Sequence, residues 1–249
     1  MFANSAPVDS PQPGIHSGLG ETVHRHLGAP WRAPVPAHTA RAFAQAQRWR
    51  ARRDQWRTDS PLLLDSGCGT GASSVQLALS RPDALVIGLD KSAARLARAP
   101  QQAAQCENLL LLRADSAHFL RLLVEEGWTL ERHYILYPNP WPRPGHLGRR
   151  WHGHPVFPFL LRAGGTLEMR SNWKLYLDEM QAALAIAGVD ATVAPLAVSG
   201  TPLTPFEAKY DASGHALWRL TAQLQEASKK WQVKAGQGKG RCAPDQGPG

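Results

Sequence analysis

Short apolar runs alternate with amphipathic stretches over most of the chain. Strands that alternate with helices at this spacing form βαβ units around a buried parallel sheet. Predicted strands cover residues 62–64, 84–89, 109–112, 134–137, 166–169, 192–198 and 215–221. Predicted helices cover residues 37–57, 72–80, 92–104, 116–126, 153–162 and 173–187. The pattern predicts an α/β fold with a seven-stranded, mostly parallel sheet and helices on both faces.

The two ends of the chain break this alternation. Residues 1–36 carry six prolines and few large aliphatic side chains, and residues 226–249 are rich in Gly, Pro and Lys. Both compositions are typical of chain that does not bury a core. We expect a disordered Pro-rich arm over 1–36, one domain over 37–225 and a flexible basic tail over 226–249.

The charge balance points to a polyanionic partner. The 249 residues include 28 Lys and Arg against 20 Asp and Glu, a formal net charge of +8. Residues 132–167 contain five arginines and four histidines but no acid, and a second basic run covers residues 48–57. A basic run can be a solvated surface, but two of them, one in a Pro-rich loop, favour RNA or DNA.

Several classes of protein are not expected. No stretch approaches eighteen consecutive apolar residues, and the first fourteen residues lack the basic and apolar regions of a signal peptide. Cys68, Cys106 and Cys242 are scattered without metal-ligand spacing. We therefore expect a cytoplasmic protein, a monomer or a loose dimer, that neither spans a membrane nor binds a metal.

A glycine-rich loop follows the first predicted strand and opens a helix. It consists of Asp65, Gly67, Gly69 and Gly71 with small residues between them, and Cys68 serves as one of these spacers. Glycines allow a tight turn and a close approach of a ligand to the backbone. The loop lacks the Gly-Lys-Ser/Thr ending of a Walker A motif. An acid before the first glycine suits a cationic sulfonium ligand that also carries an amino group.

Two more acids end the next two predicted strands. Asp90 lies 19 residues after Gly71, where a carboxylate can accept both hydroxyls of a ribose. Asp115 ends the third strand, where an adenine edge is commonly met, although capping the following helix is a rival role. With Asp65, these acids at three successive strand ends predict S-adenosylmethionine as the cofactor.

A Pro-rich loop, Tyr-Pro-Asn-Pro-Trp-Pro-Arg, follows the fourth predicted strand at residues 137–143. Its prolines stiffen the backbone and hold Asn139 and Trp141 in place. The Trp ring can stack on a base, and the arginines and histidine at 143–150 can hold the adjoining phosphates. The alternative is a rigid surface loop with a core tryptophan.

These segments resemble the successive motifs of bacterial tRNA (guanine-N7) methyltransferases. The resemblance is carried by DSGCGTG, LDKS, PNPWPR, GHLGRR, AGGTLEMRSNW and TPFEAKYDASG, in order, between about residues 61 and 220. It implies a class I Rossmann-like methyltransferase that modifies a guanine in the tRNA variable loop. The expected cofactor residues are Asp65, Gly67, Gly69, Gly71, Asp90, Asp115 and Asn139. The expected substrate residues are Arg143, His146, Arg149, Arg150, Asn172, Thr204 and Glu207.

The chain departs from the family pattern near the target base. The family typically has Asp where Asn139 stands, Thr-Asp where Ser171 and Asn172 stand, and Lys where Arg143 stands. Guanine N7 has a free lone pair, so methylation needs alignment and tolerance of positive charge rather than a general base. Glu207 is then the remaining carboxylate for the guanine edge. Asn139 and Glu207 are the candidate catalytic residues.

Two other functions stay open at this point. Asn-Pro-Trp is faintly similar to the Asn-Pro-Pro-aromatic loop of enzymes that methylate exocyclic amines, whose Asn oxygen accepts a hydrogen bond from the amine. Only one proline follows Asn139 here. A catalytically inactive RNA-binding relative that keeps the fold and the basic face is the other alternative.

Overall fold

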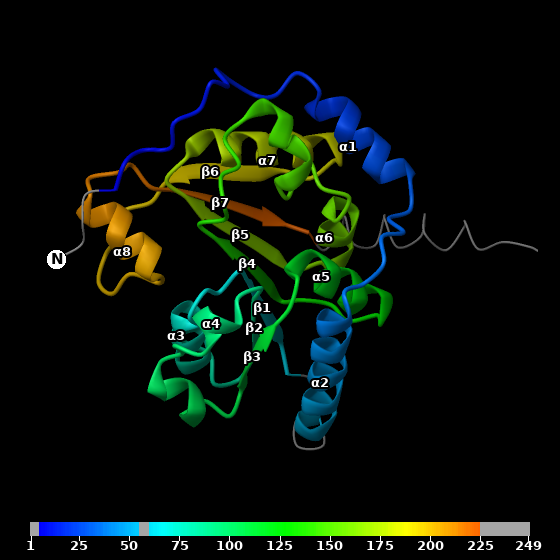
Figure 1. The fold of residues 1–249 in the computed structure, drawn as a ribbon, viewed down its shortest axis with the longest axis vertical. Coiled ribbons are helices and arrows are strands. Elements are labelled where there is room, and N and C mark those ends of the chain that lie inside the picture. The colour runs from blue at the N-terminus through cyan, green and yellow to red at the C-terminus, as the bar shows by residue number, and fades with distance from the viewer. Residues whose placement is uncertain (1–4, 55–59, 225–249) are drawn as a thin grey trace, which may run out of the picture.

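A computed structural model describes residues 5–54 and 60–224, which fold around one twisted sheet (Figure 1). The seven strands lie in the order β3-β2-β1-β4-β5-β7-β6, and β7 runs antiparallel to both of its neighbours. The strands are β1 (Leu62–Ser66), β2 (Leu85–Asp90), β3 (Leu109–Arg113), β4 (Arg132–Leu136), β5 (Thr166–Ser171), β6 (Ala191–Pro195) and β7 (Trp218–Gln223). The predicted mostly parallel α/β sheet is confirmed. The predicted tail at 226–249 lies outside the described residues.

Helices cover both faces of the sheet. Successive strand residues point to opposite faces, so Leu62 and Leu64 join one buried cluster while Leu63 joins the other. The larger cluster packs under α1 (Leu19–Gly28), α2 (Ala37–Asp54), α5 (Ser116–Glu125), α6 (Phe157–Ala163) and α7 (Lys174–Ile186). The smaller cluster packs under α3 (Ala72–Ser80). The remaining helical segments are α4 (Ala93–Leu96), η1 (Gln101–Gln105), η2 (Pro144–Arg149) and α8 (Pro205–Ala212).

The N-terminal arm is ordered from residue 5 onward, so the prediction of disorder is wrong for residues 5–36. Figure 1 shows this segment, in blue, running over the sheet edge into α1. Leu19 and Val23 lie one helical turn apart and are both buried, and α1 packs against α6 and α7. These two buried side chains on one helix face contribute to the docking of the arm. Its proline content concealed this short amphipathic stretch.

Two other predicted elements differ from those observed. The predicted helix 92–104 is divided into α4 and the 3-10 segment η1, because Pro100 cannot continue the hydrogen bonding of a helix. The predicted helix 153–162 begins only at Phe157. Within the described ranges, the chain forms no helix of sufficient length and apolarity to cross a membrane.

Candidate active site

The glycine loop, residues 65–71, connects β1 to α3 at the carboxyl edge of the sheet. The backbone φ angles of Gly67, Gly69 and Gly71 are +85°, +64° and +83°. Residues that carry a Cβ rarely adopt such positive φ angles. The amides of Gly67 and Cys68 both donate to the Leu89 carbonyl at 2.8 Å. A Cβ added at Gly67 or Gly69 would meet no atom within 4 Å. The loop is therefore fixed to β2 while its outer side stays open to a ligand.

Asp65, the first residue of this loop, has one carboxylate oxygen without a hydrogen-bond partner among the described residues. Oδ2 accepts hydrogen bonds from the hydroxyls of Ser73 at 2.6 Å and Ser74 at 2.7 Å. Oδ1 is buried and has no partner among the described residues. Burial raises the pKa of Asp65, partly offset by the two serines. A cationic ligand near Oδ1 would favour the ionised form, so the site suits an ammonium or sulfonium group.

Asp90 ends β2 and fastens the glycine loop to the next turn. Its side chain accepts hydrogen bonds from the amides of Gly69 at 3.0 Å and Ser92 at 2.7 Å. Arg95 forms an ion pair with it at 2.9 Å. Only 3% of Asp90 is exposed. The carboxylate is held at the strand end where the sequence predicted it.

Asp115 caps α5, as the rival interpretation stated. Its Oδ1 accepts from the His118 amide at 3.0 Å, and Lys91 pairs with Oδ2 at 2.8 Å. Burial acts to raise the pKa of Asp115, but these donors outweigh it and lower the pKa. A capping carboxylate keeps lone pairs for another donor, so adenine contact at Asp115 stays a prediction.

Cys68 has the environment of an inert spacer. The thiol is buried inside the glycine loop, and burial together with the nearby Asp65 raises its pKa. A thiol that stays protonated is a poor nucleophile. This agrees with the role predicted from the sequence.

The Pro-Trp loop, residues 137–143, follows β4 and lies next to the glycine loop. Because β1 and β4 are parallel neighbours, their carboxyl ends meet at the same edge. Tyr137 and Trp141 both have left-handed backbones, with φ of +50° and +49°. Asn139 lies exposed between them, and its Oδ1 accepts weakly from the Trp141 amide at 3.4 Å. The loop thus presents the Asn139 side chain at its tip.

The basic side chains around Trp141 fall into two groups. Arg143 and Arg149 are exposed, and the Arg149 guanidinium lies 4.6 Å from the centre of the Trp141 ring. His146 packs edge-on against the same ring at 5.5 Å. Phosphate or base contacts by these side chains stay a prediction.

Arg150 belongs to the second group and corrects the prediction. It is 0% exposed and forms an ion pair with the equally buried Glu179 of α7. A fully buried guanidinium cannot reach a phosphate, so the predicted phosphate contact of Arg150 is wrong. The adjacent arginines looked equivalent in the sequence, but η2 ends at Arg149 and turns the two side chains apart.

Glu207 and Thr204 form the N-terminal cap of α8. The Thr204 hydroxyl accepts from the Glu207 amide at 2.9 Å, the arrangement typical of a Thr-x-x-Glu sequence. The Glu207 carboxylate is 2% exposed and accepts from Arg170, the Tyr137 hydroxyl and the Leu203 amide. The expectation that Glu207 meets guanine directly is not supported, because each oxygen already has two donors.

Asn172 directly follows the carboxyl end of β5, and its side chain contacts the segment after α8. Its Nδ2 lies 3.0 Å from Nδ1 of His215. No local pattern in the sequence indicated this pairing, nor the roles of Arg170 and Glu179, since each contacts a residue distant in the chain. The Thr-x-x-Glu spacing is the one signal that could have shown Glu207 as a capping residue.

No group of three or more His, Cys, Asp or Glu side chains suited to a metal ion occurs in the part of the chain that the structure describes. The polar groups at the carboxyl edge are instead dispersed over the glycine loop and the Pro-Trp loop. This arrangement fits an extended organic cofactor next to a second ligand.

Comparison with known proteins agrees with this geometry. A family model described as putative methyltransferase matches residues 59–220. A tRNA (guanine-N(7)-)-methyltransferase of Shewanella oneidensis is 30% identical over 169 residues, covering 64% of this chain and 70% of the relative. The enzyme of the same name from Alcanivorax borkumensis is 31% identical over 175 residues, covering 65% and 72%.

Solved structures share the fold at lower identity. The 16S rRNA methyltransferase KamB superposes with a TM-score of 0.51 and 20% identity, covering 70% of this chain and 93% of that one. The aminoglycoside resistance methyltransferase NpmB1 gives a TM-score of 0.51 and 18% identity, covering 71% and 93%. With the glycine loop, the strand-end acids and the Pro-Trp loop in place, the chain belongs to the methyltransferase family of the tRNA (guanine-N(7)-)-methyltransferases, as a divergent member.

Proposed function

We propose that this protein transfers a methyl group from S-adenosylmethionine to N7 of a guanine in tRNA. The observation that carries the proposal is the meeting of the glycine loop and the Pro-Trp loop at the carboxyl ends of the adjacent strands β1 and β4. Ligands of open α/β sheets bind at such a point, where the strand order reverses. The relatives named above act on this substrate, and the basic side chains beside the loop suit an RNA.

The residues of the glycine loop fit S-adenosylmethionine. The unpartnered Oδ1 of Asp65 suits the ammonium of the methionine part, and the open sides of Gly67 and Gly69 leave room for the cofactor. Asp90, at the end of β2, is the carboxylate that we expect to accept hydrogen bonds from the ribose hydroxyls. When bound, the cofactor supplies a methyl group on a positively charged sulfur.

The Pro-Trp loop has the task of orienting the base. N7 attacks with its own lone pair, so the loop needs to hold the purine in line and to exclude water rather than move a proton. Trp141 offers a ring for stacking, and the exposed Asn139 offers an amide oxygen and a donor to the base edge. Asn139 supplies a dipole where relatives of this family carry a charge, which is a weaker stabiliser of the cationic product.

Exposed arginines hold the RNA beside the loop. Arg143 and Arg149 are the exposed cations here, and the stacking of Arg149 on Trp141 fixes its direction. Each phosphate that they neutralise releases counterions, which makes binding salt-dependent. Glu207 accepts hydrogen bonds from Tyr137 and Arg170, so its role is to position the Pro-Trp loop rather than to contact the base.

The direct test is methyl transfer from labelled S-adenosylmethionine to bulk tRNA, followed by nucleoside analysis. We expect label in 7-methylguanosine. Label in an N-methylated exocyclic amine would contradict the proposal and assign Asn139 as the acceptor for an amine. Cofactor binding without any turnover on tRNA would identify an inactive RNA-binding relative.

Asn139→Asp tests the altered loop. A carboxylate at this exposed position would stabilise positive charge on the purine, so kcat/KM should rise by about threefold to tenfold, close to 1 kcal/mol. The matched control is Asn172→Asp, whose side chain is engaged with His215 and should give a smaller gain. A loss of activity in Asn139→Asp would show that the amide itself is needed.

A further inference from the structure

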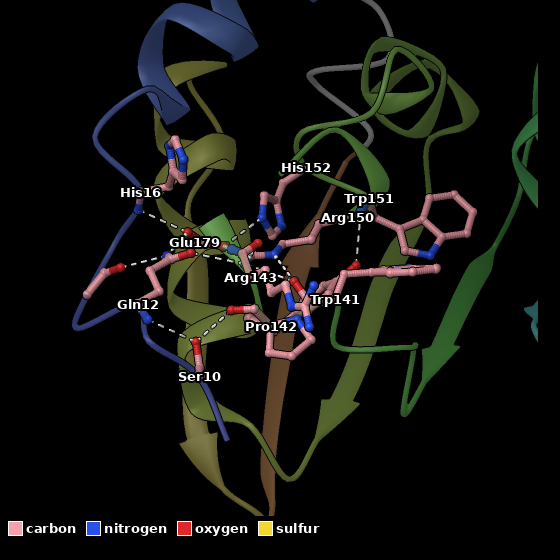
Figure 2. A network of polar contacts seen from close by, with 12 residues as sticks. Ser10, Gln12, His16, Trp141, Pro142, Arg143, Arg150, Trp151, His152 and Glu179 are labelled. Carbon is pink, nitrogen blue, oxygen red and sulfur yellow. Dashed lines mark hydrogen bonds and ion pairs between the residues drawn. The ribbon is translucent and has the colours of Figure 1, made fainter. Parts of the chain in front are cut away.

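Glu179 of α7 lies at the centre of a buried polar network that the sequence did not reveal. Figure 2 shows it between the N-terminal arm and the Pro-Trp loop. Its carboxylate is 0% exposed and accepts from Arg150, from His152 Nε2 at 3.0 Å, from Gln12 Nε2 at 2.6 Å and from the His16 amide at 2.9 Å. Two of these four donors come from the arm. Every lone pair of the carboxylate is therefore used.

Arg150 extends this network into the Pro-Trp loop (Figure 2). Its Nη2 donates to the carbonyls of Trp141 at 3.0 Å and Arg143 at 3.3 Å, and its Nε donates to Trp141 as well. The hydroxyl of Ser10 donates to the carbonyl between them, that of Pro142, at 2.7 Å. The backbone carbonyls of three consecutive loop residues, 141–143, thus accept hydrogen bonds from Arg150 or Ser10.

Such holding matters because the loop backbone is strained. Trp141 adopts φ of +49° although it has a bulky side chain. A left-handed conformation costs a non-glycine residue on the order of 1–2 kcal/mol and persists only where the surroundings enforce it. Among the described residues, the donors to the Trp141 carbonyl come from Arg150, and Arg150 is itself oriented by Glu179 and Gln12. The network therefore enforces the conformation of the loop.

We propose that Glu179, Arg150 and Gln12 are positioning residues for methyl transfer, and that the N-terminal arm is a working part of the active site. None of the three is among the residues to which the proposed function assigns a contact with the cofactor or the base. They act through the Pro-Trp loop by setting the direction of Asn139 and Trp141. This proposal rests on the proposed function for its activity readout.

Gln12→Ala is the main test, because it removes the side-chain contacts of one arm residue with Glu179 and Arg150 and leaves the Arg150–Glu179 ion pair in place. A small displacement of the loop should lower kcat on tRNA about ten- to hundredfold. The affinity for S-adenosylmethionine should stay within about twofold, because the glycine loop has no contact with Gln12. The matched control is Asp9→Ala, an exposed change in the same arm.

Moving the negative charge from position 179 to position 12 tests whether the activity lost in Glu179→Gln can be restored. Glu179→Gln leaves Arg150 buried without an anion and should abolish most activity. Adding Gln12→Glu returns the negative charge to the other side of the same guanidinium, where Gln12 Oε1 already lies 3.0 Å from Nη2. The double variant should be about tenfold more active than Glu179→Gln alone. A double variant no better than the single one would overturn the proposal.

Hydrogen exchange separates this proposal from the proposed function. Amides of residues 138–150 should exchange faster in Gln12→Ala than in the wild type or Asp9→Ala, whether or not tRNA is methylated. Unchanged exchange together with wild-type kcat would overturn the positioning role. A wild-type protein that shows network-dependent exchange but no methyl transfer would overturn the proposed function and leave the network standing. A parallel loss of cofactor affinity in Gln12→Ala would indicate general destabilisation and contradict the proposal.

Discussion

The two halves of the carboxyl edge are built in different ways. On the cofactor side, Asp65 binds serines eight and nine positions away, and Asp90 binds partners two to 21 positions away. On the substrate side, Gln12 and Glu179 are 167 positions apart, and Ser10 and Pro142 are 132 positions apart. The cofactor half is thus assembled from neighbouring turns. The substrate half is assembled from the N-terminal arm, the Pro-Trp loop and α7, which are far apart in the chain.

This difference has a physical consequence for stability. Contacts between residues close in the chain close only short loops and therefore cost little entropy. Contacts between residues far apart in the chain depend on the docking of whole helices or strands. The Pro-Trp loop should therefore lose its conformation before the glycine loop does, because it needs both the arm and α7 in place. Of the substitutions below, those of Asp90 and Glu207 should each affect one half and spare the other.

The largest effect is expected at Arg150. Arg150→Met removes the only cation that pairs with the fully buried Glu179 among the described residues, and it should lower the free energy of unfolding by about 3–5 kcal/mol. Urea unfolding measures this change. Arg149→Met, at the exposed neighbouring position, should stay within about 0.5 kcal/mol of the wild type. Equal losses in both variants would remove the distinction between the two arginines.

Asp90→Ala should break the cofactor half. It removes the carboxylate proposed to accept from the ribose, together with the contact to the Gly69 amide, and affinity for S-adenosylmethionine should fall by on the order of 2–4 kcal/mol. Calorimetry gives the affinity directly. Glu107→Ala, an exposed acid remote from the loop, is the control. Unchanged affinity in a folded Asp90→Ala protein would disprove the ribose assignment.

Glu207→Gln should affect only the substrate half. It weakens the hold on Arg170 and Tyr137, so kcat/KM with tRNA should fall by the equivalent of about 1–3 kcal/mol, while cofactor affinity is spared. Glu168→Gln is the matched control, since Glu168 pairs with the same Arg170 but does not contact Tyr137. If both variants lose equal activity, the loss comes from the altered ion pairing of Arg170, and the contact between Glu207 and Tyr137 does not contribute.

The smallest effect concerns the salt dependence of tRNA binding. Arg149→Ala should reduce the slope of log affinity against log salt by about 0.7–0.9, the value for one lost phosphate contact. Arg81→Ala should leave the slope unchanged, because Arg81 is occupied by Asp83 and Glu131 at the end of α3. Filter binding over a potassium chloride series is sufficient. An unchanged slope in Arg149→Ala would assign that side chain to packing on Trp141 alone.

The accuracy of the sequence predictions follows the same division. The seven strands were each predicted within a few residues, because buried strands appear as apolar runs of fixed period. Asp90 at the end of β2 and the glycine loop after β1 were placed correctly for a similar reason. The sequence did not predict that the N-terminal arm is ordered, that Arg150 is buried, or that both carboxylate oxygens of Glu207 already accept hydrogen bonds within the protein. Each depends on a partner that no local pattern indicates.

The sequence by itself determined the sheet, its edge and the family, since strand period, glycine spacing and motif order are local properties of the chain. Only the tertiary structure decided which charges face solvent and which lie in the interior. Arg149 and Arg150 are adjacent and chemically identical, yet one is exposed and the other pairs with Glu179. The reason is that burial of a charge requires a partner of opposite sign. Folding brings that partner from α7 and completes the network with Gln12 from the arm.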